Sequence, residues 1–163
     1  MIEAADRHYE PGKFTTFSGY EWTAGKANYL SNRREAQPIH RNVIFKGGKV
    51  SGVPFSGFNS SDPENLWAWM DKERAKGIDL LAIPHNANMS NGVMYNTFSG
   101  KELTAAYAQS RARNEPINEV VQIKGQSMSH PILSPNDEFA DFELFNYTFS
   151  PKRPMSQPKN SYA

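Results

Sequence analysis

Residues 78–92 read Ile-Asp-Leu-Leu-Ala-Ile-Pro-His-Asn-Ala-Asn-Met-Ser-Asn-Gly, and the rest of the chain can be placed around them. The apolar run between Gly77 and Pro84 predicts a short buried strand. His85 and a series of Asn and Ser side chains follow directly, so this strand delivers polar groups just beyond its end. In sheets built from βα units, ligands and catalytic groups gather at the carboxyl ends of strands. His85 therefore stands where we expect chemistry.

Helices and short apolar strands alternate on both sides of this stretch. Further strands are predicted from aromatic and β-branched residues at 14–21, 39–45 and 120–123. Helices are predicted at 2–9, from the capping sequence Ser61-Asp-Pro-Glu64 to Lys76, and at 102–113. The alternation favours an α/β fold with a mainly parallel sheet or barrel over an antiparallel sandwich.

The domain organisation follows from length and local composition. A chain of 163 residues is long enough for one domain that buries roughly 70% of its unfolded surface. We expect a single α/β domain over residues 1–149 and a Pro-rich, weakly structured tail over residues 150–163. In the helix after Ser61, an inward apolar stripe is predicted from Leu66, Trp69 and Met70.

Overall charge and composition exclude several classes of function. Eighteen basic and 17 acidic residues give a net charge of +1, so we expect no nucleic-acid partner and no attraction to anionic membranes. No apolar run is long enough for a membrane span, and residues 1–10 lack the apolar segment of a signal peptide, which leaves localisation open. The absence of cysteine leaves metal binding to His, Asp and Glu.

Candidate ligands of this kind lie at predicted strand ends. His40, His85 and His130 sit at junctions between strands and loops, although a histidine in such a place is more often a hydrogen-bonded structural residue. Glu21 lies in an apolar strand between Tyr20 and Trp22, where burying a carboxylate without a partner is costly. A carboxylate with imidazoles is the ligand set of hydrolytic metal centres, in which the ion lowers the pKa of bound water.

The most acidic stretch, 136–145, carries four carboxylates: Asp137, Glu138, Asp141 and Glu143. A solvated face is favoured over a metal cluster here, because such charge patterning is ordinary on protein surfaces. The stretch is predicted as a short helix leading into a strand.

Five segments of the chain resemble, in the same order, an uncharacterised bacterial family, domain of unknown function 3604. They are Phe14-Thr-Thr-Phe-Ser-Gly-Tyr-Glu-Trp-Thr, His40-Arg-Asn-Val-Ile-Phe-Lys-Gly, Ile83-Pro-His-Asn-Ala-Asn-Met-Ser-Asn-Gly, Arg111-Ala-Arg-Asn-Glu-Pro and Leu133-Ser-Pro-Asn-Asp-Glu-Phe-Ala. That family is in turn similar to the polymerase and histidinol phosphatase (PHP) metal-dependent phosphoesterases.

This resemblance implies a fold and a site. The fold would be part of a distorted PHP-like β/α barrel. Glu21 would be a bridging carboxylate and His40 and His85 imidazole ligands of a divalent metal, either manganese, zinc or iron. Asn86, Asn88 and Arg41 are the candidate substrate-binding residues, for a small phosphorylated substrate.

The chain also departs from the PHP pattern. It lacks a His-x-His motif in the first strand and an Asp-x-His motif in the last, and Met128 stands where the family would have glutamate. We therefore expect a fragment or shortened relative of a metal-dependent phosphoesterase-like hydrolase, with weak metal binding and little activity alone. The alternative is a non-catalytic ligand- or protein-binding α/β domain. An incomplete barrel would leave a strand edge uncovered, which predicts self-association.

Overall fold

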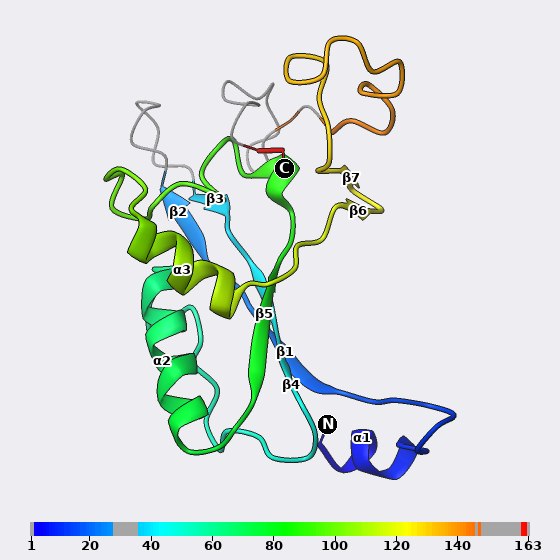
Figure 1. Cartoon of the computed structure of the whole chain (residues 1–163), viewed down its shortest axis with the longest axis vertical. Helices are drawn as coiled ribbons and strands as arrows, with labels where there is room; N and C mark the ends of the chain where they lie inside the picture. The colour runs from blue at the N-terminus through cyan, green and yellow to red at the C-terminus, as the bar shows by residue number, and fades with distance from the viewer. Residues whose placement is uncertain (1, 28–35, 146, 148–160, 163) are drawn as a thin grey trace.

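A computed structural model describes residues 2–27, 36–145, 147 and 161–162 (Figure 1). Its helices are α1 (Ile2–His8), α2 (Pro63–Ala75), α3 (Ala105–Asn114) and the 3-10 turn η1 (Ala87–Met89). Its strands are β1 (Ser18–Trp22), β2 (Gly25–Ala27), β3 (Ala36–Pro38), β4 (Arg41–Phe45), β5 (Leu80–Pro84), β6 (Val121–Gln122) and β7 (Gly125–Gln126). Among the described residues, none of the helices has the length and apolar character needed to cross a bilayer.

The central sheet has the strand order β1-β4-β5, and both pairings are antiparallel. Two-stranded antiparallel pairs, β2-β3 and β6-β7, complete the described strands. The expectation of mainly parallel strands in part of a PHP-like barrel is therefore wrong: no closed barrel and no parallel pairing occurs within the described ranges.

The connection between β4 and β5 explains the error. Two neighbouring parallel strands need a connection that runs back once along the sheet. The helix predicted from Ser61 to Lys76 would have been such a connection. Here residues 46–62 first run back along the sheet, and α2 then returns in the direction of β4 (Figure 1). β5 consequently starts beside the end of β4, with Leu80 opposite Phe45 and Pro84 opposite Arg41.

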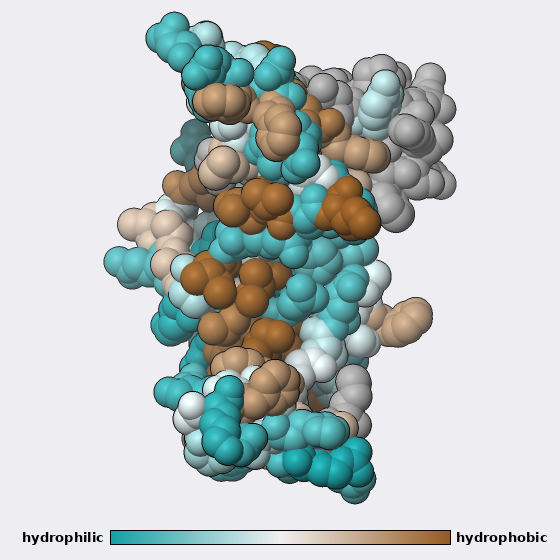
Figure 2. Space-filling view, turned by 90° about the vertical axis from the view of Figure 1, so that its right-hand side faces the viewer, coloured by the Kyte–Doolittle hydropathy of each residue, from teal (hydrophilic) through white to brown (hydrophobic). Residues whose placement is uncertain are grey.

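The two faces of this sheet differ in what covers them. Alternate residues Arg41, Val43 and Phe45 of β4 are buried, and so are Leu80 and Ala82 of β5, on the face that α2 and α3 cover (Figure 1). The intervening side chains point to the opposite face. Figure 2 looks onto the side of the molecule away from α2, where apolar side chains are exposed.

Helix α2 supplies most of the helical part of the core. Asp62, rather than Ser61, caps its first turn by accepting a hydrogen bond from the Glu64 amide at 2.9 Å. Leu66 and Met70 are buried as predicted, but Trp67 is buried more completely than Trp69 and points between α2 and α3. Gly77, with φ of +79°, ends the helix in the left-handed conformation that glycine adopts without strain.

The carboxyl-terminal half contains less regular structure than expected. The helix predicted at 102–113 begins later, at Ala105, because Thr104 accepts a hydrogen bond from the Tyr107 amide and caps it. Residues 136–145 form turns and neither a helix nor a strand. Most of the predicted tail lies outside the described residues, but Ser161 and Tyr162 are buried.

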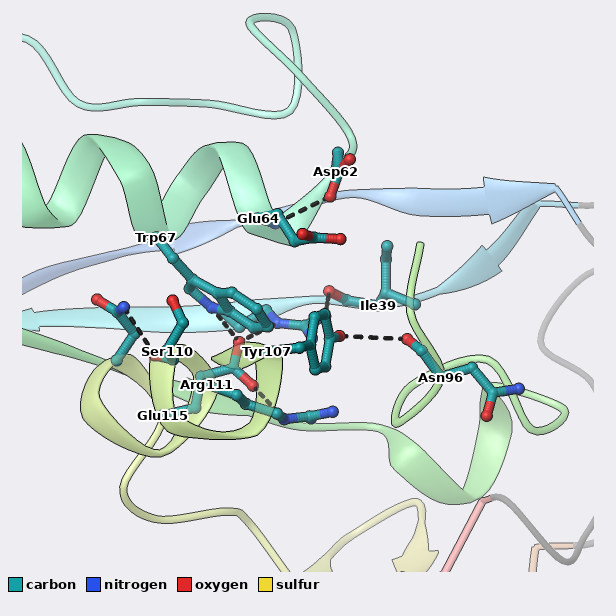
Figure 3. Close-up of polar contacts among 11 residues, drawn as sticks. Ile39, Asp62, Glu64, Trp67, Asn96, Tyr107, Ser110, Arg111 and Glu115 are labelled. Atoms are coloured by element: carbon teal, nitrogen blue, oxygen red, sulfur yellow. Dashed lines mark hydrogen bonds and ion pairs between the residues drawn. The ribbon is translucent and has the colours of Figure 1, made fainter. Parts of the chain in front are cut away.

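A buried ion pair between Arg41 and Glu115 joins α3 to the sheet, and Figure 3 shows its carboxylate, Glu115, together with Trp67 and Arg111. The Glu115 carboxylate follows α3 and accepts hydrogen bonds from Arg41 Nε at 2.9 Å and Trp67 Nε1 at 2.8 Å. The Arg111 guanidinium, one turn earlier, lies 3.1 Å from the second oxygen. Because the side chains of Arg41 and Glu115 are 1% and 0% exposed, water cannot solvate either charge if the other is removed.

We predict that Glu115→Gln lowers the free energy of unfolding by about 3–5 kcal/mol, because the variant leaves the Arg41 charge buried without its carboxylate. Urea unfolding followed by tryptophan fluorescence measures the change. Glu10→Gln is the matched control: its exposed ion pair with Lys13 contributes less than about 1 kcal/mol. Equal losses in the two variants would contradict this account of the core.

Candidate metal centre

Three of the predicted ligands, Glu21, His40 and His85, come together at one end of the central sheet. Their nearest ligand atoms all lie within 4.8 Å of one another. His40 Nδ1 is 3.0 Å from Glu21 Oε1, and His85 Nε2 is 3.9 Å from the same oxygen. No other group of three or more His, Asp or Glu residues in the described part of the chain is arranged in this way.

Strand pairing explains why residues so far apart in sequence meet. Glu21 lies opposite Asn42 in the β1–β4 pair, and Asn42 lies opposite Ile83 in the β4–β5 pair. Side chains that face one another across a sheet share a face, and so do those two residues apart along a strand. His40 and His85 are therefore on the same face as Glu21, and the His85 amide bonds to the His40 carbonyl at 3.3 Å.

The three side chains differ in their access to solvent. Glu21 is 46% exposed, His40 is 20% exposed and His85 is 9% exposed. Thr23 Oγ1 donates a hydrogen bond of 2.8 Å to Glu21 Oε1 and orients the carboxylate toward the histidines. The centre is therefore closed to solvent at His85 and open to solvent at Glu21.

Both imidazoles are held in their neutral form at neutral pH. Burial lowers the pKa of His40 and of His85 below the usual value, and the Glu21 carboxylate opposes this effect at both residues. The positive charge of Lys124 lowers both pKa values further. Since an imidazole binds metal only when its ligand nitrogen is unprotonated, these shifts favour metal binding.

The donor set fits a divalent ion. Ligand atoms around a tetrahedral zinc ion with bonds of 2.0–2.1 Å lie about 3.3 Å apart, and the distances of 3.0 and 3.9 Å to Glu21 are on either side of that value. Nδ1 of His85 is buried and has no hydrogen-bond partner among the described residues. The backbone of Ile83 also acts on this imidazole and raises its pKa, against the larger effect of burial.

A cavity of about 550 Å³ opens beside the centre. Glu21 and His40 form part of its wall, and Phe58 and Ser61 come from the loop before α2. The volume falls within the range of pockets that hold small molecules. The cavity therefore opens onto the exposed side of the three-residue centre.

The predicted substrate-binding residues do not line this cavity. Arg41 points to the other face of the sheet, into the ion pair with Glu115. Asn86 Oδ1 accepts a hydrogen bond from Gln122 Nε2 at 2.8 Å, and Asn88 Nδ2 donates to the Lys124 carbonyl at 2.9 Å. Asn86 has a φ of +64°, a left-handed conformation that asparagine tolerates, and this directs it toward β6. Both asparagines hold the β6–β7 hairpin against the loop after β5.

The remaining singled-out residues lie away from the centre. Met128 is 55% exposed, and the His130 ring packs 5.0 Å from the Tyr162 ring. The four carboxylates of the 136–145 stretch are exposed, in agreement with a solvated face. Lys124 and Thr23 were not identified from the sequence, since an isolated lysine in a turn and a threonine after a strand carry no recognisable motif.

The geometry defines a small domain of helices and antiparallel sheets, with a candidate centre of two histidines and one glutamate. A model of the family described as "Protein of unknown function (DUF3604)" matches residues 1–163, and the chain belongs to this family. No curated protein and no solved structure matches the chain.

We predict that Glu21→Gln lowers the pKa of His40 and His85 further, because the carboxylate is the main group that stabilises their protonated forms. Proton NMR titration of the imidazole signals measures the shifts, with His8 and His130 as internal references. Glu64→Gln, on the exposed surface of α2, is the control and leaves both values unchanged. A rise in either pKa would contradict the assigned geometry.

The same shifts make stability depend on pH. In the unfolded chain these histidines take up protons near pH 6.5, whereas in the folded chain they do so only at lower pH. The contribution of the two neutral histidines to the free energy of unfolding is therefore fully present above pH 6.5. It is lost as the pH falls through their pKa values in the folded chain.

Proposed function

We propose that this chain binds a divalent metal ion through Glu21, His40 and His85 and belongs to a hydrolase that acts on phosphate esters. The observation that supports the proposal is the approach of three ligand atoms to within 4.8 Å beside a cavity. Two imidazoles and one carboxylate form the ligand set of several hydrolytic zinc sites. The PHP-like motifs around these same three residues favour phosphate esters as the substrate class.

A bound ion would supply Lewis acidity toward a phosphoryl oxygen and would increase the acidity of water. The chain's own residues would perform the remaining tasks. His85, nearly buried, fixes the position of the centre. Glu21 contributes the negative charge that partly neutralises a divalent ion, and Thr23 holds its carboxylate in orientation. The cavity wall beside Phe58 and Ser61 would receive the organic part of the ester.

The number of protein ligands determines how tightly the site should bind metal. Catalytic zinc sites use three protein ligands and an open fourth position, whereas two-metal phosphoesterase sites need more. Met128 is 55% exposed and offers no carboxylate. We therefore propose one weakly bound ion and slow turnover by this chain alone.

Metal titration tests the ligand set. Calorimetry with zinc and with manganese should show binding to the unaltered chain, and Glu21→Gln, His40→Ala and His85→Ala should each weaken it at least about tenfold. This is the lower limit expected, since loss of an outer partner of a ligand already costs 10–100-fold. His130→Ala is the control, because His130 lies outside the centre. This variant should bind metal as tightly as the unaltered chain. Equal binding by all variants would refute the site.

Hydrolysis separates the enzyme from a binding domain. With zinc or manganese, the unaltered chain should release phosphate slowly from p-nitrophenyl phosphate, and His85→Ala should abolish the metal-dependent rate. Metal binding without any metal-dependent hydrolysis would contradict the enzymatic part of the proposal and leave the binding part standing.

A second candidate function, protein binding, is favoured by the uncovered face of the sheet. Ile44, Leu81 and Ile83 lie on the face opposite the helices and are only half-buried, and Phe17, Ile44 and Leu81 line a hollow there. Figure 2 shows exposed apolar side chains on the side of the molecule away from α2. Exposed apolar surface of this kind is typical of interaction sites. In this function, the face would bind another protein surface or a second copy of the chain.

For the second candidate, we predict that the unaltered chain self-associates with increasing concentration and that Leu81→Asp abolishes the association by placing a charge on the apolar face. Sedimentation velocity over a hundredfold range of concentration measures it. Leu103→Asp is the control, because Leu103 is 61% exposed outside the sheet. A monomer at every concentration would exclude self-association through this face.

A further inference from the structure

The β6–β7 hairpin is fastened to the loop that carries His85. The Glu119 amide, just before β6, donates to the Pro84 carbonyl at 3.0 Å, and Gln122 Nε2 donates to Asn86 Oδ1 at 2.8 Å. The Asn88 amide donates to Ser127 Oγ at 3.1 Å, while its side chain donates to the Lys124 carbonyl at 2.9 Å. Hydrogen bonds at Pro84, before His85, and at Asn86 and Asn88, after it, therefore hold the hairpin beside the candidate metal centre.

Lys124 occupies the turn of this hairpin. Residues 123 and 124 connect β6 to β7, and Gly125 follows with a φ of +96°. A Cβ at Gly125 would lie 2.6 Å from the Glu143 carbonyl oxygen, so this position requires glycine and the turn packs closely against Glu143. The backbone of Lys124 is thus held in place from two directions, by the Asn88 side chain and by this close approach.

The side chain of Lys124 makes no hydrogen bond to another residue that the structure describes. It forms no ion pair within the part of the chain that the structure describes, and it is half-buried. Its charge reaches both His40 and His85, and it also lowers the pKa of Glu119, which burial raises. The turn that carries this positive charge is therefore fastened next to the loop of His85, and no carboxylate among the described residues forms an ion pair with it.

The balance of charge indicates what it would bind. Glu21 would neutralise only one of the two charges of a divalent ion, because an imidazole binds metal in its neutral form. Lys124 adds a further positive charge next to that excess. A site of this composition favours a ligand that carries more than one negative charge, and lysine is a common ligand of phosphate oxygens.

We propose that Lys124 is a substrate-binding residue whose ammonium group contacts the phosphoryl oxygens of a phosphate monoester held at the Glu21–His40–His85 centre. The inference rests on the proposed function and assigns to Lys124 the role that sequence reasoning gave to Arg41, whose guanidinium is used in the core. Asn86 and Asn88 act as positioning residues, since they hold the hairpin rather than the substrate.

Two calorimetric titrations of the full chain test this inference: zinc into the metal-free protein, then inorganic phosphate into the zinc-loaded protein. Lys124→Gln should bind zinc at least as tightly as the unaltered chain, because a neighbouring cation is removed. It should bind phosphate at least about tenfold more weakly, because a charge-assisted hydrogen bond is lost. Lys124→Arg retains the charge and should recover most of the phosphate affinity.

Lys72→Gln is the matched control, because Lys72 is an exposed lysine on α2; it should change neither titration. Absence of zinc binding to the unaltered chain would overturn the proposed function and this inference with it. Zinc binding with no phosphate binding, or with phosphate binding that Lys124→Gln leaves unchanged, would overturn this inference alone. Loss of both zinc and phosphate binding in Lys124→Gln would also overturn it, since Lys124 would then be a structural residue.

Discussion

The antiparallel pairing of β4 with both of its neighbours determines the rest of the structure. It places Trp22, Arg41 and Pro84 in one row across the sheet, and the residues next to them in the following row. Because side chains alternate along a strand, successive residues of β4 serve different purposes. Arg41 faces the helices and His40 faces away from them. A shift of register by one residue would exchange these roles and separate Glu21 from the histidines.

The two faces therefore divide core from candidate site. On the helix side, Arg41 and Glu115 form a buried ion pair among Trp22, Trp67 and other aromatic residues. On the opposite side, the same strands present a carboxylate and two imidazoles next to a cavity, and the β6–β7 hairpin is bonded to the loop that follows His85. The candidate site thus uses polar residues at the end of an otherwise apolar sheet face.

The sequence predicted the parts that depend on local chemistry. The capping sequence identified α2, aromatic and β-branched residues identified β1 and β4, and the apolar run between Gly77 and Pro84 identified β5. Glu21, His40 and His85 were identified from their positions at strand ends and from the family motifs, and the structure brings them together. Strand direction was predicted wrongly, because residues 46–62 carry no periodic signal that shows they return along the sheet. The burial of Arg41 was also missed, since its partner Glu115 lies 74 residues away. Lys124 was missed because tertiary hydrogen bonds, which leave no local signal in the sequence, hold its hairpin against the loop after β5.

The separation of Arg41 from Glu115 also has a consequence for folding. Contacts that join distant parts of a chain form slowly, because a long loop must be ordered before the contact stabilises anything. Until α3 docks, a sheet formed from β1, β4 and β5 would hold the Arg41 guanidinium against apolar side chains without its carboxylate. Such a partly folded state is disfavoured by its own unpaired charge. The ion pair therefore makes the sheet and α3 fold as a single cooperative unit, even though they come from different halves of the chain.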